Sequence, residues 1–161
     1  MERKGLDFYK LKEDLIRDEG YKREPYFDHL GYVSFGIGRN LIGNPLTNME
    51  RAYGARIGFS SPQFVNHLYE NDINSVIDDL DTNFSFWRTL LPDSQRGLAN
   101  MRFQLGPKRF REFKNSLSLI QAGHLHAAGV ELRKSKWWRE DTRDRAERTI
   151  RLIEGTHVSK V

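Results

Sequence analysis

The sequence predicts an α+β fold of two lobes, in which a small antiparallel β lobe and a larger helical lobe are joined by a long helix. Two observations predict this fold. Aromatic and apolar residues alternate loosely with glycine in residues 22–42, and the sequence after Asp81 has the pattern of successive short helices. The length of 161 residues suits one domain with its own core, so we treat residues 1–161 as a single domain.

The N-terminal part of the chain predicts one helix followed by the β lobe. A helix is expected over residues 7–19, because Asp7 suits the N-cap position, an apolar stripe follows it and Gly20 can end it. The β lobe is expected over about residues 20–60, with short strands, tight turns and one short helix near residues 47–53.

The longest helix is predicted over about residues 62–81. Ser61 suits its cap, Pro62 occupies its first position, and apolar residues recur with helical spacing as far as Leu80. Such a helix spans roughly 30 Å and can join two lobes, between which ligands commonly bind. The helical lobe is expected over about residues 82–161. Breaks in its helical pattern fall at Pro92, Gly106, Pro107 and Gly123.

The charge distribution favours a polyanionic partner. The net charge is +4, but residues 1–80 contain 10 basic and 13 acidic side chains, whereas residues 81–161 contain 16 and 9. A basic half is attracted to nucleic acid, anionic lipid or anionic cell-wall polymer, and charge alone does not separate them. No DNA- or RNA-binding motif occurs among these residues, so no nucleic-acid partner is expected.

Composition excludes several kinds of site. The chain has no cysteine, which excludes disulfides and cysteine-ligated metals. Its five histidines lack a metal-binding spacing, so we expect no metal and no other cofactor. The charged N-terminus has no apolar run of signal-peptide length, and no stretch approaches the roughly 20 apolar residues of a membrane span. We therefore expect no stable membrane insertion.

Two acids and a hydroxyl lie close together in the sequence where the β lobe begins. Glu19 ends the first helix, Asp28 follows nine residues later, and Ser34 follows six residues after that. Glycoside hydrolysis requires one protonated and one ionised carboxyl group, and a hydroxyl can position the attacking water. From spacing alone an alternative stays open, in which Glu19 is an exposed helix-end acid and Asp28 a turn residue bonded to its own backbone.

This region resembles the N-terminal lobe of the phage lysozymes of the T-even type, glycoside hydrolase family 24. The resemblance is carried by LIRDEG, YFD and GYVSFGIGRNL, which match the family's glutamate, aspartate, hydroxyl and glycines in order, with Ser34 in place of a threonine. Further matches follow in the family's order at FVNHLYENDINSV, NMRFQLG, FKNSL, KSKWW and TRDRAERTIRLIEGT. The resemblance thus covers nearly the whole chain. It implies a lysozyme-like two-lobed fold, with the first helix packed on the C-terminal lobe.

By this resemblance the protein is an endolysin. It would be a muramidase that lyses the host cell by hydrolysing the β-1,4 bond between N-acetylmuramic acid and N-acetylglucosamine in bacterial peptidoglycan. Glu19 would be the general acid, Asp28 the carboxylate that supports the developing positive charge or directs water, and Ser34 the residue that positions the attacking water. The reaction would invert the sugar carbon. Serine keeps the hydroxyl of threonine without its methyl group, so we expect activity with looser positioning of the water.

The resemblance also implies substrate-binding and supporting residues. Asn100 and Gln104 are four residues apart and share a helix face, which the family turns toward the cleft. Arg145 matches an arginine that pairs with the catalytic glutamate, and Glu131 stands where the family carries a substrate-contacting asparagine. The substrate-binding residues are expected to be Asn40, Phe103, Gln104, Ser116 and Glu131, and the supporting residues Arg145, Asn100, Tyr26 and Gly38.

Two pairs of residues are interpreted as structural. Arg39 stands where a member of the family has a histidine, and the aspartate that pairs with that histidine is present as Asp72. We expect a stabilising Arg39–Asp72 ion pair that does not titrate near neutral pH. Trp137 and Trp138 are interpreted as core of the helical lobe rather than as a platform for sugar, and one of them is an insertion relative to the family pattern.

Other functions stay open at this point. A lysozyme-fold module without activity would bind the cell wall or belong to a phage structural assembly, and a retaining or transglycosylase reaction would form an anhydro product. We expect a monomer that acts on peptidoglycan. With no signal segment, a free endolysin would accumulate in the host cytoplasm and reach the periplasmic peptidoglycan through a holin-type pore.

Overall fold

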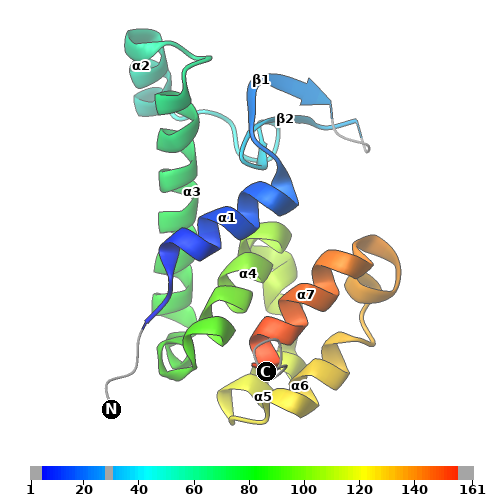
Figure 1. Ribbon diagram of the computed structural model, residues 1–161. Helices are drawn as coiled ribbons and strands as arrows, with labels where there is room; N and C mark the ends of the chain where they lie inside the picture. The colour runs from blue at the N-terminus through cyan, green and yellow to red at the C-terminus, as the bar shows by residue number, and fades with distance from the viewer. Residues whose placement is uncertain (1–4, 28–30, 156–161) are drawn as a thin grey trace. The chain divides into compact units, whose positions relative to one another are not determined.

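The chain forms a mainly helical structure with a small antiparallel sheet (Figure 1). The computed structural model describes residues 5–27 and 31–155. Contacts divide the chain into two compact units, which we call the helical unit (residues 1–11 and 76–161) and the β unit (residues 12–75). The combination of helices with a small antiparallel sheet confirms the predicted α+β class.

Helix α1 (Phe8–Glu19) confirms the first predicted helix. The backbone amide of Lys10 donates a hydrogen bond to Asp7 Oδ1 at 3.0 Å, so Asp7 acts as the expected cap. Gly20 follows with φ of 87°, and its amide donates to the carbonyl of Ile16 at 2.8 Å. The left-handed glycine therefore ends the helix at Glu19.

The sheet of the β unit is built from strands β1 (Lys22–Phe27), β2 (Val33–Gly36) and β3 (Arg39–Asn40) in the order β1-β2-β3. Both pairings are antiparallel. The central strand β2 contributes Phe35 to the core, where its ring lies 5.9 Å from that of Phe64. The buried side of the sheet thus rests on aromatic packing.

Two helices complete the β unit. Helix α2 (Asn48–Ile57) starts where predicted, at a reciprocal capping box of Thr47 and Glu50, but it continues past residue 53 as far as Ile57. Helix α3 (Pro62–Asn83) begins where predicted, and the Phe64 amide donates to Ser61 Oγ at 3.1 Å. The residues of α3 as far as Ser75 belong to the β unit.

The helical unit is organised around α4 (Pro92–Glu112), which packs along α7 (Arg143–Glu154) (Figure 1). A Cβ atom at Gly97 would lie 2.9 Å from Ile153 Cγ1 and from the Thr149 carbonyl oxygen, so glycine allows this close approach. Gly106 has non-helical φ and ψ within α4, which confirms the predicted break before Pro107. The remaining elements are η1 (Ser85–Thr89), α5 (Lys114–Gln121), α6 (Leu125–Leu132) and the π-helical η2 (Trp137–Asp141).

The core of the helical unit consists of large apolar side chains from η1, α4, α6, η2 and α7. Its fully buried members include Trp87, Leu98, Met101, Phe110, Leu132, Trp137 and Ile150. Within the described residues, no helix has both the length and the apolar character needed to cross a membrane.

Candidate active site

Glu19 lies at the C-terminal end of α1, against the turn that joins β2 to β3. A Cβ atom built on Gly38 would come within 2.8 Å of Glu19 Cγ, Cδ and Oε1. Gly38 also has φ of 68°, a backbone conformation that favours glycine. The missing side chain at Gly38 thus makes room for the carboxyl group of Glu19 beside the backbone of the turn.

Ser34 lies on the central strand of the same sheet and is 6% exposed. Its Cα partners are Tyr26 on β1 and Asn40 on β3, so these three predicted site residues occupy one row across the sheet. Asn40 Oδ1 accepts hydrogen bonds from the amides of Ile42 at 2.9 Å and Gly43 at 3.2 Å. Asp28 lies outside the described residues.

The β unit therefore brings together five of the predicted residues: Glu19, Tyr26, Ser34, Gly38 and Asn40. A buried hydroxyl on the sheet and a carboxyl group beside the next turn are groups suited to moving a proton and orienting a water molecule. The backbone has positive φ at both Gly36 (66°) and Gly38 (68°), and the missing Cβ atom at Gly38 leaves the room that the Glu19 carboxyl group occupies.

A second group of predicted residues lies in the helical unit. Asn100 on α4 is 1% exposed, and its Oδ1 accepts hydrogen bonds from Arg145 Nε at 3.2 Å and Nη2 at 2.9 Å. Gln104, one turn later, donates to Thr142 Oγ1 at 3.0 Å and accepts from Trp137 Nε1 at 3.0 Å. Both amide side chains are thus fixed in orientation by partners elsewhere in the helical unit.

The other predicted substrate-binding residues lie on three different helices. Phe103 is half-buried on α4, and Ser116 is buried on α5. Glu131 lies on α6, where Lys134 Nζ is 3.1 Å from its Oε1. The negative charge at Glu131 therefore has a cation directly beside it.

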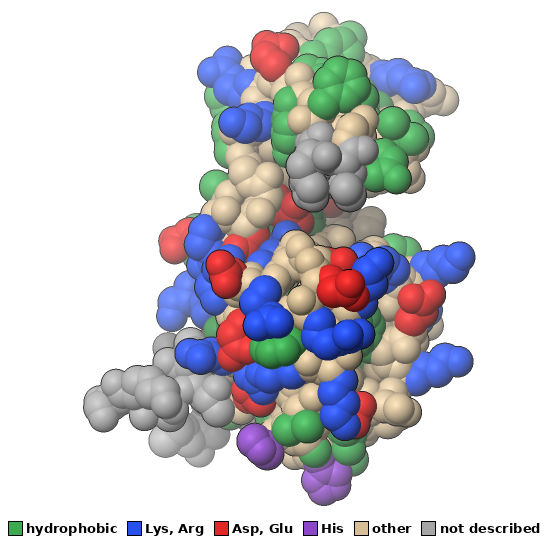
Figure 2. Space-filling view, turned by 90° about the vertical axis from the view of Figure 1, so that its right-hand side faces the viewer, with side chains coloured by type: hydrophobic (Ala, Val, Ile, Leu, Met, Phe, Trp, Pro, Cys, Tyr) green, Lys and Arg blue, Asp and Glu red, His purple; other side chains and the backbone are tan. Residues whose placement is uncertain are grey.

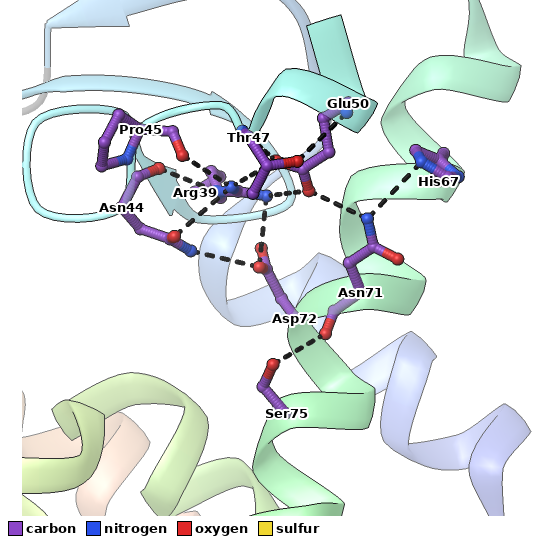
Figure 3. Close-up of polar contacts among 9 residues, drawn as sticks. All are labelled: Arg39, Asn44, Pro45, Thr47, Glu50, His67, Asn71, Asp72 and Ser75. Atoms are coloured by element: carbon purple, nitrogen blue, oxygen red, sulfur yellow. Dashed lines mark hydrogen bonds and ion pairs between the residues drawn. The ribbon is translucent and has the colours of Figure 1, made fainter. Parts of the chain in front are cut away.

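A cluster of polar groups surrounds Arg39 in the β unit (Figure 3). We call it the Arg39 cluster, and it consists of Arg39, Asn44, Pro45, Glu50 and Asp72. The predicted ion pair with Asp72 is present, with Arg39 Nη1 3.2 Å from Asp72 Oδ1. Glu50, which the sequence analysis did not identify, is the closer partner, since its two oxygens accept from Nη2 at 2.8 Å and Nη1 at 3.0 Å.

The pKa values of the two carboxyl groups of the cluster are shifted in opposite directions. Burial of Glu50 favours its neutral form, but hydrogen bonds from Arg39, the Thr47 amide and Asn71 outweigh burial and lower its pKa to about 2. Burial raises the pKa of Asp72 to about 6, against the opposing effects of Arg39 and Asn44. The expectation of a pair that does not titrate near neutral pH is therefore wrong for Asp72, because the removal of its carboxyl group from water outweighs the attraction of Arg39.

The described part of the chain contains no group of three or more His, Asp or Glu side chains that converge as metal ligands. Two of the five histidines, His29 and His157, lie outside the described residues.

Comparison with known proteins identifies the family. The chain is 32% identical over 159 residues to probable T4-type lysozyme 2 of Dictyostelium discoideum, covering 89% of this chain and 93% of that protein. The chain belongs to the T4-type lysozymes. No protein-family model matches it.

Two phage proteins with T4-type lysozyme similarity are much longer than this chain. The peptidoglycan hydrolase gp36 of Pseudomonas phage phiKMV is 30% identical over 148 residues, covering 91% of this chain but 15% of that protein. The pre-baseplate central spike protein Gp5 of Enterobacteria phage T4 is 27% identical over 157 residues, covering 89% of this chain and 27% of that protein. Sequence similar to this chain thus occurs both as most of a protein and as a segment of a larger one.

Trp137 belongs to the core of the helical unit, as interpreted from the sequence, whereas Trp138 is half-buried. Trp137 is 1% exposed, and its ring packs edge-on against Phe113 with centroids 5.9 Å apart. Trp138 Nε1 donates to Glu147 at 2.9 Å, and the guanidinium of Arg143 lies 3.7 Å from the Trp138 ring. Trp137 is also the partner that orients Gln104, a connection that no feature of the sequence indicates.

One signal for the missed Glu50 was present in the sequence. Thr47 and Glu50 have the spacing of a capping box, which predicts that the glutamate points back toward the start of its helix. The pattern does not predict burial, which arises because Arg39 and Asn71 approach Glu50 from other elements.

Proposed function

We propose that this chain is an endolysin-type muramidase. Its reaction would be hydrolysis of the β-1,4 bond between N-acetylmuramic acid and N-acetylglucosamine in bacterial peptidoglycan, with inversion at the sugar carbon. The observation that carries the proposal is the place of Glu19 in a T4-type lysozyme chain, at the end of α1 with its carboxyl group against Gly38. The names of two relatives, a lysozyme and a peptidoglycan hydrolase, support the substrate.

Each step of the reaction is assigned to a residue of the β unit. Glu19, when protonated, gives its proton to the leaving glycosidic oxygen. Asp28, ionised, supports the positive charge that develops on the sugar ring or directs the water. Ser34 orients the attacking water through its hydroxyl, and its burial on β2 restricts the directions in which that hydroxyl can act.

The helical unit supplies groups for binding the substrate. Gln104 is oriented by Trp137 and Thr142, so its position on α4 is fixed before a sugar arrives. Phe103 offers an aromatic surface next to it in the sequence, and Ser116 and Glu131 offer polar groups. Arg145 holds Asn100 in place through its hydrogen bonds, and its supporting role for the reaction comes from the resemblance to the family.

The proposal is tested on purified peptidoglycan. Glu19→Gln keeps the size of the side chain but has no proton to donate, so hydrolysis is expected to fall by at least roughly 100-fold. Ser34→Ala is expected to lose most activity, while Ser34→Thr equals or exceeds the wild type because its rotamer is more restricted. Product configuration measured by NMR separates inversion from retention and from an anhydro product. Unchanged hydrolysis by Glu19→Gln would exclude this mechanism.

A second function is favoured by the similarity to a segment of a phage central spike protein. In that case the chain would bind the cell wall or serve within a phage assembly without catalysis. A turbidity assay on chloroform-treated Gram-negative cells discriminates between the two. Clearing by the wild type and none by Glu19→Gln supports the enzyme, whereas no clearing by either variant supports the binding module.

The surface charges of the helical unit give no support to a nucleic-acid partner. On the face shown in Figure 2, Lys and Arg side chains over the helical unit are mixed with Asp and Glu rather than gathered in one stripe. Several cations of the helical unit form ion pairs within it, as in Arg133 with Glu147 and Glu154 and Arg109 with Asp141. We place the free enzyme in the host cytoplasm, from which it would reach the periplasmic peptidoglycan through a holin-type pore.

A further inference from the structure

The position of the Glu19 carboxyl group depends on a short turn. Glu19 Cγ, Cδ and Oε1 each lie 2.8 Å from the point where Gly38 would carry a Cβ atom. The carboxyl group therefore rests directly on the backbone between β2 and β3. Any shift of this turn toward or away from α1 changes the space that the carboxyl group occupies.

The sheet itself constrains this turn weakly. Strand β3 consists of Arg39 and Asn40 alone, paired with Phe35 and Ser34 of β2. A strand of two residues offers few ladder hydrogen bonds, so other contacts have to fix its position.

Those contacts come from the side chain of the residue that directly follows Gly38. Arg39 is 3% exposed, and acceptors surround its guanidinium on every side (Figure 3). Its Nε donates to the Asn44 carbonyl at 2.9 Å, and Nη2 donates to the Pro45 carbonyl at 3.2 Å and to Asn44 Oδ1 at 3.3 Å. With Glu50 and Asp72 included, the Arg39 cluster connects β3 to the following loop, to α2 and to α3.

Glu50 is the part of the cluster that sets the direction of the guanidinium. Its carboxylate accepts from both terminal nitrogens of Arg39 in the forked geometry that arginine and carboxylate prefer. The same carboxylate accepts from the Thr47 amide at 2.9 Å and from Asn71 Nδ2 at 2.9 Å, and Glu50 is 2% exposed. Glu50 is therefore fixed from α2 and α3 independently of Arg39.

We propose that Arg39, oriented by Glu50, is a positioning residue for the Glu19 carboxyl group. The forked ion pair keeps the backbone at Gly38 against that carboxyl group. It thereby keeps the acidic proton of Glu19 within reach of the position of the glycosidic oxygen. The inference rests on the proposed role of Glu19. The other titratable groups facing the ion pair are Asp72 and His67, both on α3, with His67 Nε2 3.5 Å from Asn71 Nδ2.

The test compares Arg39→Lys with Arg102→Lys. Lysine keeps the positive charge at either position but cannot bind one carboxylate through two terminal nitrogens as arginine does. Arg102 is a matched control, since it is a buried arginine whose Nε lies 2.7 Å from Asp79 in the helical unit. Both variants are expected to melt at a lower temperature. Rates are measured on soluble peptidoglycan fragments well below that temperature, over a range of pH.

Arg39→Lys is expected to lower kcat roughly 10-fold with KM changed less than about twofold, because a misplaced carboxyl group affects the chemical step. The alkaline limb of its pH–rate profile is expected to move to lower pH. The reason is that a loosened turn admits water, which favours the ionised form of the Glu19 carboxyl group. Arg102→Lys leaves kcat and the profile as in the wild type. Glu50→Gln acts in the same direction as Arg39→Lys, and the double variant loses no more than Arg39→Lys alone.

Two results would overturn the inference. One is an Arg39→Lys enzyme with wild-type kcat and pH profile, and the other is a loss that is fully additive with that of Glu50→Gln. Glu19→Gln separates this failure from failure of the proposed function. If Glu19→Gln is inactive and Arg39→Lys behaves like Arg102→Lys, only the positioning role is lost. If Glu19→Gln is fully active, the proposed function itself is lost.

Discussion

Replacing Gly38 with alanine is expected to reduce activity much more than an equally strained substitution nearby. The new methyl group would lie 2.8 Å from three atoms of the Glu19 side chain, whereas ordinary contact begins at 3.4 Å. The carboxyl group therefore has to move by about 0.6 Å, because the backbone of the turn is the less mobile partner. A displacement of about 1 Å in an active site can cost roughly 100-fold in rate, so a loss of roughly 10-fold or more is expected.

Gly36 provides the matched control for this substitution. Its φ of 66° nearly equals the 68° of Gly38, so alanine carries the same left-handed penalty of about 1–2 kcal/mol at either position. A Cβ atom at Gly36 would meet Val65 Cγ1 at 3.5 Å, an ordinary contact. Gly36→Ala is thus expected to lose stability to a similar degree and to keep its kcat.

The assay is hydrolysis of soluble peptidoglycan fragments, with the folded fraction of each variant checked by circular dichroism at the assay temperature. Urea denaturation gives the two free energies of unfolding for comparison. Equal losses of kcat in Gly36→Ala and Gly38→Ala would refute the reasoning, because they would show that strain in the turn matters and contact with Glu19 does not.

Two predictions concern stability. Burial raises the pKa of Asp72 from an ordinary 3.8 to about 6 in the folded protein, so the stabilisation from its protonated form is complete below about pH 4 and is lost as pH rises through 6. Asp72→Asn is therefore expected to gain about 2–3 kcal/mol over the wild type at pH 7 and nothing at pH 3.5, as measured by urea denaturation; an equal effect at both pH values would contradict the burial argument. Gly97→Ala places a methyl group 2.9 Å from Ile153 Cγ1 and the Thr149 carbonyl, and overpacking of about 1–3 kcal/mol is expected to outweigh the gain in helix propensity. Thermal denaturation would show a lower midpoint, and an unchanged or higher midpoint would mean that α4 and α7 separate easily.

Local signals in the sequence were sufficient for most helix boundaries. Asp7, Ser61 and the Gly106–Pro107 break each act through a neighbouring backbone group, so the sequence alone places them within a residue of where they occur. Helix α2 starts at the predicted place, where Thr47 and Glu50 form a capping box, but it continues to Ile57 rather than ending near residue 53. It ends before Gly58, whose positive φ of 98° does not continue a helix.

The polar contacts of the site were less predictable, because they join residues far apart in the sequence. The Arg39–Asp72 pair was expected by resemblance, yet the forked partner is Glu50, whose burial depends on elements on both sides. Asn100 likewise has the pattern of an exposed helix residue, but Arg145, 45 positions later, packs against it. Residue type and spacing indicate which groups can bond, whereas the shared use of one cation by two acids depends on the packing of three elements.

The π-helical turn at Trp137–Asp141 has a consequence for how the chain can change length. The Thr142 amide bonds to the Trp137 carbonyl at 3.1 Å, so one hydrogen-bonded turn contains a residue more than an α-helical turn does. In a continuous α-helix an added residue would rotate everything after it by about 100° and expose the buried face of α7. Here the backbone of Thr142 is not helical (φ −144°, ψ 67°), so α7 starts anew and Ala146 and Ile150 face the core without depending on the phase of the turn. A deletion within 137–141 would instead displace Trp137, which is buried in the core and hydrogen-bonds to Gln104, so we expect changes of length here to cost stability.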